Sequence, residues 1–438
     1  MDPFAVKAIQ LLLSLSLLIV LHEFGHYIPA KIFKTRVEKF FLFFDVKFAL
    51  FKKKIGETVY GIGWLPLGGY VKISGMIDES MDKEQMAQPP QPWEFRSKPA
   101  WQRLIIMLGG VTVNLVLGFL IFMMILFVWG TVYVGPEQMP KGFAVADEFK
   151  EFGFQDGDRI LEVNGKDFEN SLDINRHLFM RDVNSITVLH QNGEEETISL
   201  PEEIGTTMFQ SGVLQPFVPI QRPVLDTVVA ERAAGLAGLK KGDSIISINK
   251  QEIGYWHEIS PITQENKNKE IEIVYERDGE IKGTMVTPDE EGLLGVRQKR
   301  SFEVAKREYS LAESISEGFE DGYWTLRDYV YQFKYVFTKK GASQLGGFGA
   351  IGGLFPDTWD WQGFWHTTAL ISIILAFMNI LPIPALDGGH VTFLLYEIVT
   401  GRKPNDKFME VAQLVGFVLI LGLVLYANGN DIYKWLFE

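Results

Sequence analysis

The chain has 438 residues, of which 47% are hydrophobic and 22% are charged, and its formal net charge is −13. This length allows roughly two to four domains. Between residues 131 and 308 there are 32 acidic and 20 basic residues, so nearly all of the net negative charge lies in this middle segment. No segment supplies, on a soluble domain, the basic stripe needed to bind phosphate backbones, which excludes a nucleic-acid-binding role. Because the sequence has no cysteine, any metal must be held by histidines and carboxylates.

Four stretches are long and apolar enough to cross the hydrocarbon core of a bilayer, which takes about 20 helical residues. They are residues 4–30, 104–129, 365–399 and 411–427. The first lacks the basic start and the small-residue cleavage site of a signal peptide, so we expect a retained span. Basic residues follow span one, precede span two and fill the loop between spans three and four. The positive-inside rule therefore predicts that these flanks are cytoplasmic and that both termini and the acidic segment face the other side.

The acidic middle segment contains an internal repeat. The sequence DGDRILEVNG from Asp156 recurs as KGDSIISINK from Lys241, with Gly157 and Gly242 aligned at a spacing of 85 residues. A Gly-Asp turn before alternating apolar residues is typical of a turn that leads into a half-buried strand. The pattern resembles the PDZ domains of bacterial proteases, and AAGLAGLKKGD before the second strand fits it better than the corresponding part of the first copy. Two β-rich domains without a ligand remain the alternative.

Two further segments follow the repeat. Residues 311–337 carry Tyr, Phe and Trp among charges at helical spacing, which predicts one or two amphipathic helices. These could lie on the membrane surface or pack against the two β-rich domains. The Gly-rich run at 345–355 is a poor helix former, so we expect a loop that dips towards the membrane.

The first span contains HEFGH, formed by His22, Glu23 and His26. Residues four apart share one face of a helix, so both imidazoles can reach one metal ion while the glutamate lies beside it. Ionisable side chains inside a membrane helix cost at least about 2.5 kcal/mol each. Three of them within five residues therefore indicate a metal site more strongly than the motif alone.

A catalytic zinc with two histidine ligands needs a third protein ligand. The other apolar stretches offer four candidates, which are His366, Asp387, His390 and Glu397. His366 falls at the opposite face of the membrane from HEFGH, whereas Asp387 falls at a similar depth. Asp387 also lies in NILPIPALDGG, which must interrupt its helix, and irregular backbone is tolerated at membrane depth only where it lines a cavity. An HExxH protease of another fold, with Glu397 as third ligand, remains open.

HEFGH in the first span, the NxxPxPxLDG element in the third and the tandem PDZ-like domains between spans two and three together resemble the site-2 intramembrane zinc metalloproteases, in the bacterial RseP-type subgroup that regulates sigma factors. The resemblance implies that His22, His26 and Asp387 bind Zn²⁺ and that Glu23 is the catalytic carboxylate. It implies that Asn379 contacts the substrate near the scissile bond. It also implies a membrane-associated β-hairpin element, matched by residues 59–73, whose edge strand could hold an extended substrate or could serve only for packing.

The expected fold is a multi-span α-helical membrane protein with four transmembrane helices, a membrane-associated β-hairpin element and two inserted PDZ-like domains. The expected order is a first span with HEFGH (1–30), a cytoplasmic loop with the β element (31–103) and a second span (104–130). Two PDZ-like domains (131–220 and 221–307) and a segment with the amphipathic helices and the Gly-rich loop (308–364) follow. The chain ends with a third span (365–399) and a fourth span with the C-terminus (400–438). The expected function is intramembrane cleavage of single-span membrane proteins in a bacterial inner membrane. The resemblance implies that these substrates have first been cut by another protease, that the PDZ-like pair excludes large ones, and that they include anti-sigma factors and remnant signal peptides. The alternative is a membrane scaffold that binds peptide C-termini without cutting them.

Overall fold

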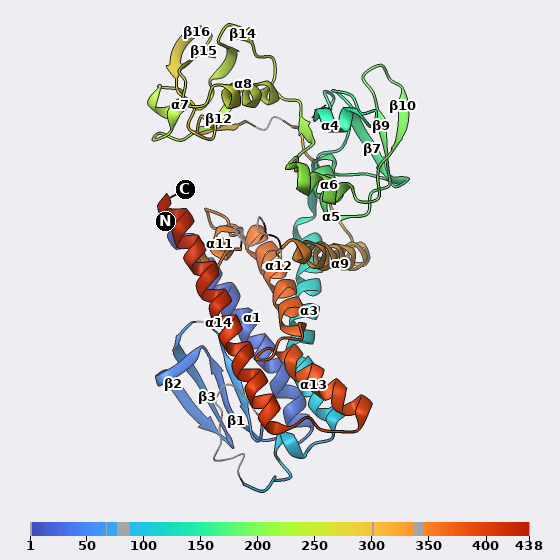
Figure 1. Cartoon of the computed structure of the whole chain (residues 1–438), viewed down its shortest axis with the longest axis vertical. Helices are drawn as coiled ribbons and strands as arrows, with labels where there is room; N and C mark the ends of the chain where they lie inside the picture. Colours follow the sequence, from blue (N-terminus) through green and yellow to red (C-terminus); the bar gives the residue numbers. More distant parts are fainter. Residues whose placement is uncertain are drawn as a thin grey trace. The chain divides into compact units, whose positions relative to one another are not determined.

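The structure, a computed structural model, describes residues 2–66, 68–76, 88–299, 302–336, 338, 341 and 345–437. The chain divides into two compact units (Figure 1). Unit 1 comprises Met1–Gly130 and Glu308–Glu438, and unit 2 is Thr131–Arg307. At the edge of unit 2, strand β5 (Thr131–Tyr133) pairs antiparallel with β18 (Ala305–Arg307), so the chain enters and leaves this unit at neighbouring points.

Unit 1 is built around four long apolar helices. They are α1 (Pro3–Ile32), α3 (Ala100–Trp129), α12 (Trp361–Ile380) and α14 (Asp406–Phe437). Each is long and apolar enough to cross a membrane, which confirms the predicted number of candidate spans for the part of the chain that the structure describes. Helix α3 packs against both α1 and α12, and the two chain termini lie at the same end of this unit (Figure 1). An even number of membrane crossings places the two termini on the same side, as is seen here.

The third predicted span is two helices and not one, as its sequence break suggests. Helix α12 ends at Ile380, and α13 (Asp387–Thr400) begins after an irregular turn. Pro382 and Pro384 lie in this turn, and proline removes a backbone donor and clashes with the preceding helical turn. Asp387 is consequently the first residue of a new helix.

Helices α1 and α3 meet at two glycines. A side chain at Gly25 would collide with the backbone of Gly109, and one at Gly109 would collide with the carbonyl of Gly25. Small residues allow membrane helices to approach closely without a gap. Because Gly25 lies inside HEFGH, this contact holds the motif directly against α3.

A four-stranded sheet follows α1. Its strands are β1 (Val37–Leu42), β2 (Phe44–Ile55), β3 (Thr58–Leu65) and β4 (Tyr70–Ile73), in the order β2-β3-β1-β4. The sheet is mixed, since β1 runs parallel to β3 and antiparallel to β4. The expectation of a simple hairpin over residues 59–73 is therefore wrong, because the buried strand β1 inserts between β3 and β4. Only β4 from that stretch is an edge strand.

The aromatic segment after unit 2 forms one helix, α9 (Leu311–Val336). A side chain at Gly318 would collide with Met123 of α3, and Tyr329 and Phe333 pack edge-on against Phe377 of α12. The apolar face of this amphipathic helix therefore covers the helices of unit 1.

The Gly-rich run was expected to be non-helical, and this is wrong for α11 (Phe348–Gly353). The carboxylate of Asp431 accepts hydrogen bonds from the backbone N–H groups of Gly347 and Ala350, at 2.9 and 3.1 Å. Asn428 accepts from Phe348 at 3.1 Å. These bonds from α14 satisfy the donors at the start of the short helix, which offsets the poor helix propensity of glycine.

Unit 2 contains two lobes, each with its own hydrophobic core. The strands of the first lobe are β6 (Phe143–Val145), β7 (Arg159–Val163), β8 (Lys166–Asp167), β9 (Ser185–Leu189), β10 (Glu195–Ser199) and β11 (Phe217–Pro219). Those of the second are β12 (Leu225–Val228), β13 (Ser244–Ile248), β14 (Gln251–Glu252), β15 (Ile271–Arg277), β16 (Glu280–Val286) and β17 (Val296–Gln298). Helices α4 (Asp147–Lys150), α5 (Ile174–Met180) and α6 (Ile204–Ser211) belong to the first lobe, and α7 (Ala233–Leu236) and α8 (Ile259–Glu265) to the second.

The sequence repeat is also a structural repeat. The main sheets have the equivalent orders β8-β7-β9-β10 and β14-β13-β15-β16. Gly157 and Gly242 both have a φ of +95°, which is a left-handed conformation that glycine adopts without strain. The buried aspartate after each glycine contacts a basic side chain. Asp158 contacts His190, next to the end of β9, and Asp243 contacts Arg277, at the end of β15.

Candidate metal centre and active site

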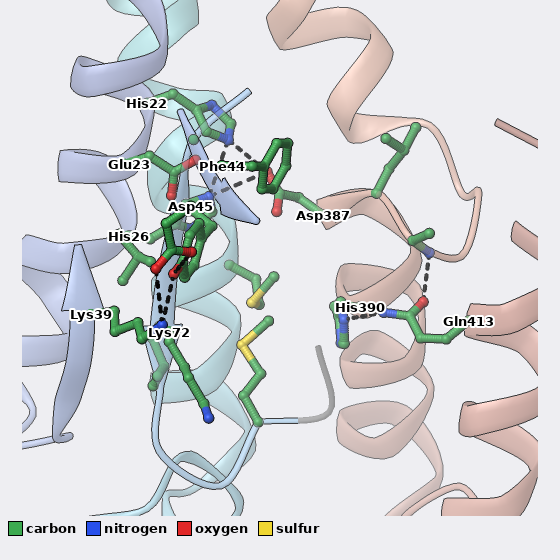
Figure 2. Close-up of a pocket in the computed structure, with 18 of the residues that line it drawn as sticks. His22, Glu23, His26, Lys39, Phe44, Asp45, Lys72, Asp387, His390 and Gln413 are labelled. Carbon is green, nitrogen blue, oxygen red and sulfur yellow. Dashed lines mark hydrogen bonds and ion pairs between the residues drawn. The ribbon is translucent and has the colours of Figure 1, made fainter. Parts of the chain in front are cut away.

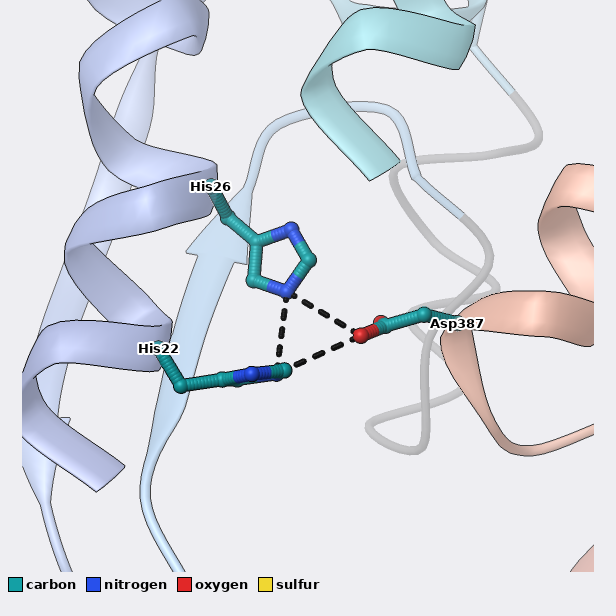
Figure 3. Close-up of side chains that lie close together, drawn as sticks. All are labelled: His22, His26 and Asp387. Atoms are coloured by element: carbon teal, nitrogen blue, oxygen red, sulfur yellow. Dashed lines mark hydrogen bonds and ion pairs between the residues drawn. The ribbon is translucent and has the colours of Figure 1, made fainter. Parts of the chain in front are cut away.

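Two histidines and one aspartate meet at one point in unit 1 (Figure 3). His22 and His26 project from one face of α1, and their Nε2 atoms lie 3.2 Å apart. Oδ2 of Asp387, at the start of α13, lies 3.2 Å from Nε2 of His22 and 3.3 Å from Nε2 of His26. The break in the third span thus brings Asp387 to the motif on α1.

This set of atoms fits a zinc ion. Bonds of about 2.0 Å to a tetrahedral ion place neighbouring ligand atoms about 3.3 Å apart, which matches all three separations. Oδ2 of Asp387 is buried and has no hydrogen-bond partner in the described part of the chain, although two imidazole nitrogens lie beside it. Three protein ligands with a fourth position left open are typical of catalytic zinc sites.

Groups on α3 orient the two imidazoles. Nδ1 of His26 lies 2.8 Å from the carbonyl oxygen of Ile106, so Nδ1 carries the proton and Nε2 keeps its lone pair for a metal. Nδ2 of Asn114 lies 3.2 Å from Nδ1 of His22, and among the described residues Oδ1 of Asn114 has no hydrogen-bond partner. Turning this amide by half a rotation lets Oδ1 accept the Nδ1 proton of His22, so that Nε2 of His22 keeps its lone pair for a metal. Sequence reasoning missed Asn114, although a buried asparagine in an apolar span is a signal of function.

The other candidate ligands lie elsewhere. His366 packs against the ring of Phe122. His390 bonds to the amide of Gln413 at 2.7 Å. Glu397 forms an ion pair with Arg103 at 2.5 Å. None of the three candidates belongs to the cluster, so the geometry favours Asp387 over Glu397.

Two cavities meet at the cluster. The first, of about 490 Å³, is bounded by the start of β2, the edge strand β4 and the start of α13 (Figure 2). The second, of about 430 Å³, is bounded by α1, α11 and α12, and Asn379 is among its lining residues. His22, Glu23 and Asp387 line both cavities. An extended chain that passes from one cavity to the other would therefore cross the cluster.

Comparison with known proteins identifies the family. Residues 10–423 match peptidase family M50. The chain belongs to this family. It is 28% identical to the zinc metalloprotease RasP of Geobacillus kaustophilus, over 95% of this chain and 96% of that protein. It is 27% identical to the regulator of sigma E protease of Haemophilus influenzae, over 97% of this chain and 98% of that protein. Identity to the regulator of sigma-E protease RseP of Salmonella typhimurium is 25%, over 96% and 97% of the two chains.

Family M50 contains the site-2 proteases, so this M50 chain is a zinc metalloprotease of that type. Its apolar helices and these relatives make it an integral membrane protein. The expected resemblance to site-2 proteases is thereby confirmed.

Replacing the third proposed ligand should separate it from its rival. We expect Asp387→Ala to lower zinc content strongly, because it removes one of three ligand atoms. Glu397→Gln should keep zinc but lower the melting temperature, since the buried Arg103 loses its charged partner, at a cost of about 3 to 5 kcal/mol. Metal analysis and thermal unfolding of both purified variants test this. Zinc loss in Glu397→Gln alone would instead favour the other HExxH fold.

Proposed function

We propose that this protein cleaves peptide bonds within the transmembrane segments of single-span membrane proteins, with His22, His26 and Asp387 holding zinc. The observation that carries the proposal is the convergence of the three ligand atoms between α1 and the broken third span. The test is incubation of the purified protein with a single-span substrate and mass spectrometry of the products. A cut outside the membrane segment would contradict the proposal, and no cut by the zinc-loaded protein would contradict it in favour of a scaffold.

Glu23 is the proposed general base. Zinc bound at the cluster supplies Lewis acidity for a water molecule and for the substrate carbonyl. The carboxylate of Glu23 is buried next to the ligands and lines both cavities, so it can take a proton from that water and return it to the leaving amine.

Asn379 is proposed to contact the substrate. It lies one residue before the end of α12 and lines the second cavity together with Glu23 and Asp387. A helical substrate hides its carbonyls in internal hydrogen bonds and must unwind before attack. An amide at this place can bond to a carbonyl or N–H group that unwinding exposes.

The edge strand β4 is proposed to hold the unwound segment by main-chain pairing. The N–H of Ser74 donates to Arg36 next to β1, so the alternation of an antiparallel ladder points the N–H groups of Val71 and Ile73 to the free edge. Residues of β4 line the first cavity, and a backbone hydrogen bond links Val71 to Glu23. Strand addition at such an edge supplies affinity without demanding a particular sequence.

Proline at the free edge should weaken cleavage. Ile73→Pro removes an outward N–H of β4 but keeps the backbone bond between Val71 and Glu23, so it does not act directly on the proposed base. Ile73→Ala, which loses the same buried side chain but keeps the N–H, is the matched control. We expect Ile73→Pro to cleave about fivefold more slowly than Ile73→Ala, for the loss of one main-chain bond of about 1 kcal/mol. Ile62 and Trp64 are unsuitable positions for this test, because β3 is paired on both sides. Equal rates for Ile73→Ala and a folded, zinc-loaded Ile73→Pro would leave β4 a packing element.

Unit 2 is proposed to be a pair of extracytoplasmic PDZ-like domains that exclude large substrates. Its acidic charge and the basic flanks of the spans support this orientation through the positive-inside rule. Two relatives named as regulators of sigma E support anti-sigma factors, trimmed by an earlier protease, as a substrate class. Remnant signal peptides are a second class with the same single-span form.

Removing unit 2 should abolish selection by size and leave the chemistry intact. The pairing of Thr131 with Arg307 places the ends of the deletion close together, so a short Gly/Ser bridge can replace Thr131–Arg307. We expect retained zinc and retained cleavage of a trimmed substrate, together with new cleavage of the same substrate carrying its folded extracytoplasmic domain. The measurement is the ratio of the two cleavage rates in each protein. An unchanged ratio in two active proteins would favour peptide capture by the second lobe.

A further inference from the structure

Helix α14 makes few apolar contacts, yet it reaches the metal centre. Of its most apolar stretch only 6% is buried, against 39% for α3. One polar side chain, Gln413, projects from it to the turn that precedes Asp387 (Figure 2). Oε1 of Gln413 accepts the N–H of Ala385 at 2.5 Å, and its Nε2 lies 2.7 Å from Nε2 of His390.

The backbone that Gln413 contacts has an uncommon conformation. Ala385 has a φ of +75°, in the left-handed region that residues with a Cβ atom seldom adopt. Such a conformation persists only when surrounding contacts hold it in place. The turn also leaves no room on its α14 side, since a side chain at Gly416 would collide with the carbonyl of Pro384.

The position of Asp387 depends on this turn. Asp387 is two residues after Ala385, and the ligand-to-ligand distances of 3.2 and 3.3 Å require its carboxylate to be placed closely. Gln413 bonds on both sides of Asp387, to Ala385 before it and to His390 on the first turn of α13. The side-chain amide of Gln413 therefore contacts the chain both before and after Asp387.

We propose that Gln413 is a positioning residue for the proposed zinc ligand Asp387, so that the side chain of Gln413 links the fourth span to the metal centre. The proposal rests on the assignment of Asp387 as a ligand. Partners that orient ligands in this way typically contribute about 10- to 100-fold to metal affinity. Gln413 acts through the backbone and His390 and does not touch the reacting atoms.

The experiment measures zinc affinity by chelator competition on the full-length protein in detergent micelles. Gln413→Met, similar in length but without hydrogen bonds, should bind zinc about 10- to 100-fold more weakly. Gln413→Glu keeps an oxygen for the N–H of Ala385 and should stay much closer to the parent. Leu414→Ala, at a half-exposed position on the same helix, is the matched control and should leave zinc affinity unchanged. Parent-like affinity of a folded Gln413→Met, or equal losses in Leu414→Ala, would overturn the proposal.

Two further arms separate positioning from general damage. Excess zinc should restore cleavage by Gln413→Met, which misfolding would prevent. Adding Ala385→Gly to Gln413→Met should recover part of the affinity, because glycine adopts this φ without strain, and no recovery would overturn the route through Ala385. Asp387→Ala is measured in parallel. If it retains zinc, the ligand assignment fails, and that result differs from a failure of Gln413 alone.

Discussion

Glu23→Gln should bind zinc as the parent does and should lose cleavage. The amide has the shape of the carboxylate but cannot take a proton, and general acid–base groups contribute typically about 10²- to 10⁴-fold to the rate. Glu23 contributes none of the three atoms that meet at the cluster, so its replacement should change zinc affinity little. The measurement combines metal content with the initial rate of cleavage of a trimmed single-span substrate.

A control for this experiment should replace a partly buried acid that has no role in the proposed reaction. Glu397→Gln serves, because it alters a carboxylate of α13 that pairs with Arg103 away from the cluster. We expect cleavage by this variant at temperatures below its lowered melting point. Zinc-loaded Glu23→Gln that cuts at the parent rate would remove Glu23 from the mechanism.

Gly110→Ala should abolish both zinc binding and cleavage. Gly110 lies on α3 opposite the motif, and an added Cβ atom would lie 2.8 Å from Nε2 of His22 and closer still to Nε2 of His26. Both are atoms that the proposal assigns to zinc, and neither ring can move without leaving the cluster. Displacement of catalytic groups by about 1 Å costs about 100-fold in rate, and the loss of two ligand positions should cost more. Zinc affinity by chelator competition and the cleavage rate report the two effects.

The same substitution at Gly422 is the matched control. Gly422 also lies in a long apolar helix, but apart from its own helical backbone an added Cβ atom would meet no atom of the described residues within 4 Å. We expect Gly422→Ala to keep zinc, cleavage and melting temperature. Parent-like zinc affinity in Gly110→Ala would show that the histidines have room to move and that this close contact does not define the site.

The sequence by itself determined the features that depend on neighbouring residues. The apolar lengths predicted four candidate spans, since the bilayer sets the length that a helix needs. HEFGH predicted two imidazoles on one helical face, because helical periodicity is a local property. Pro382 and Pro384 predicted the break in the third span for the same reason. The repeat of a Gly-Asp turn before a strand likewise predicted two similar lobes.

The tertiary structure alone decided which distant groups meet. The sequence favoured Asp387 but left Glu397 open, and the meeting of Asp387 with His22 and His26 depends on how α13 sits against α1, which no local pattern encodes. The insertion of β1 between β3 and β4 depended on strand pairing across the sheet, which made β4 the edge strand. The helix α11 formed against its glycine content because Asn428 and Asp431, far along the chain, satisfied its backbone donors. In each case the deciding interaction joins residues that are distant in sequence. Its free energy is gained only once the chain has folded, so no local pattern can report it.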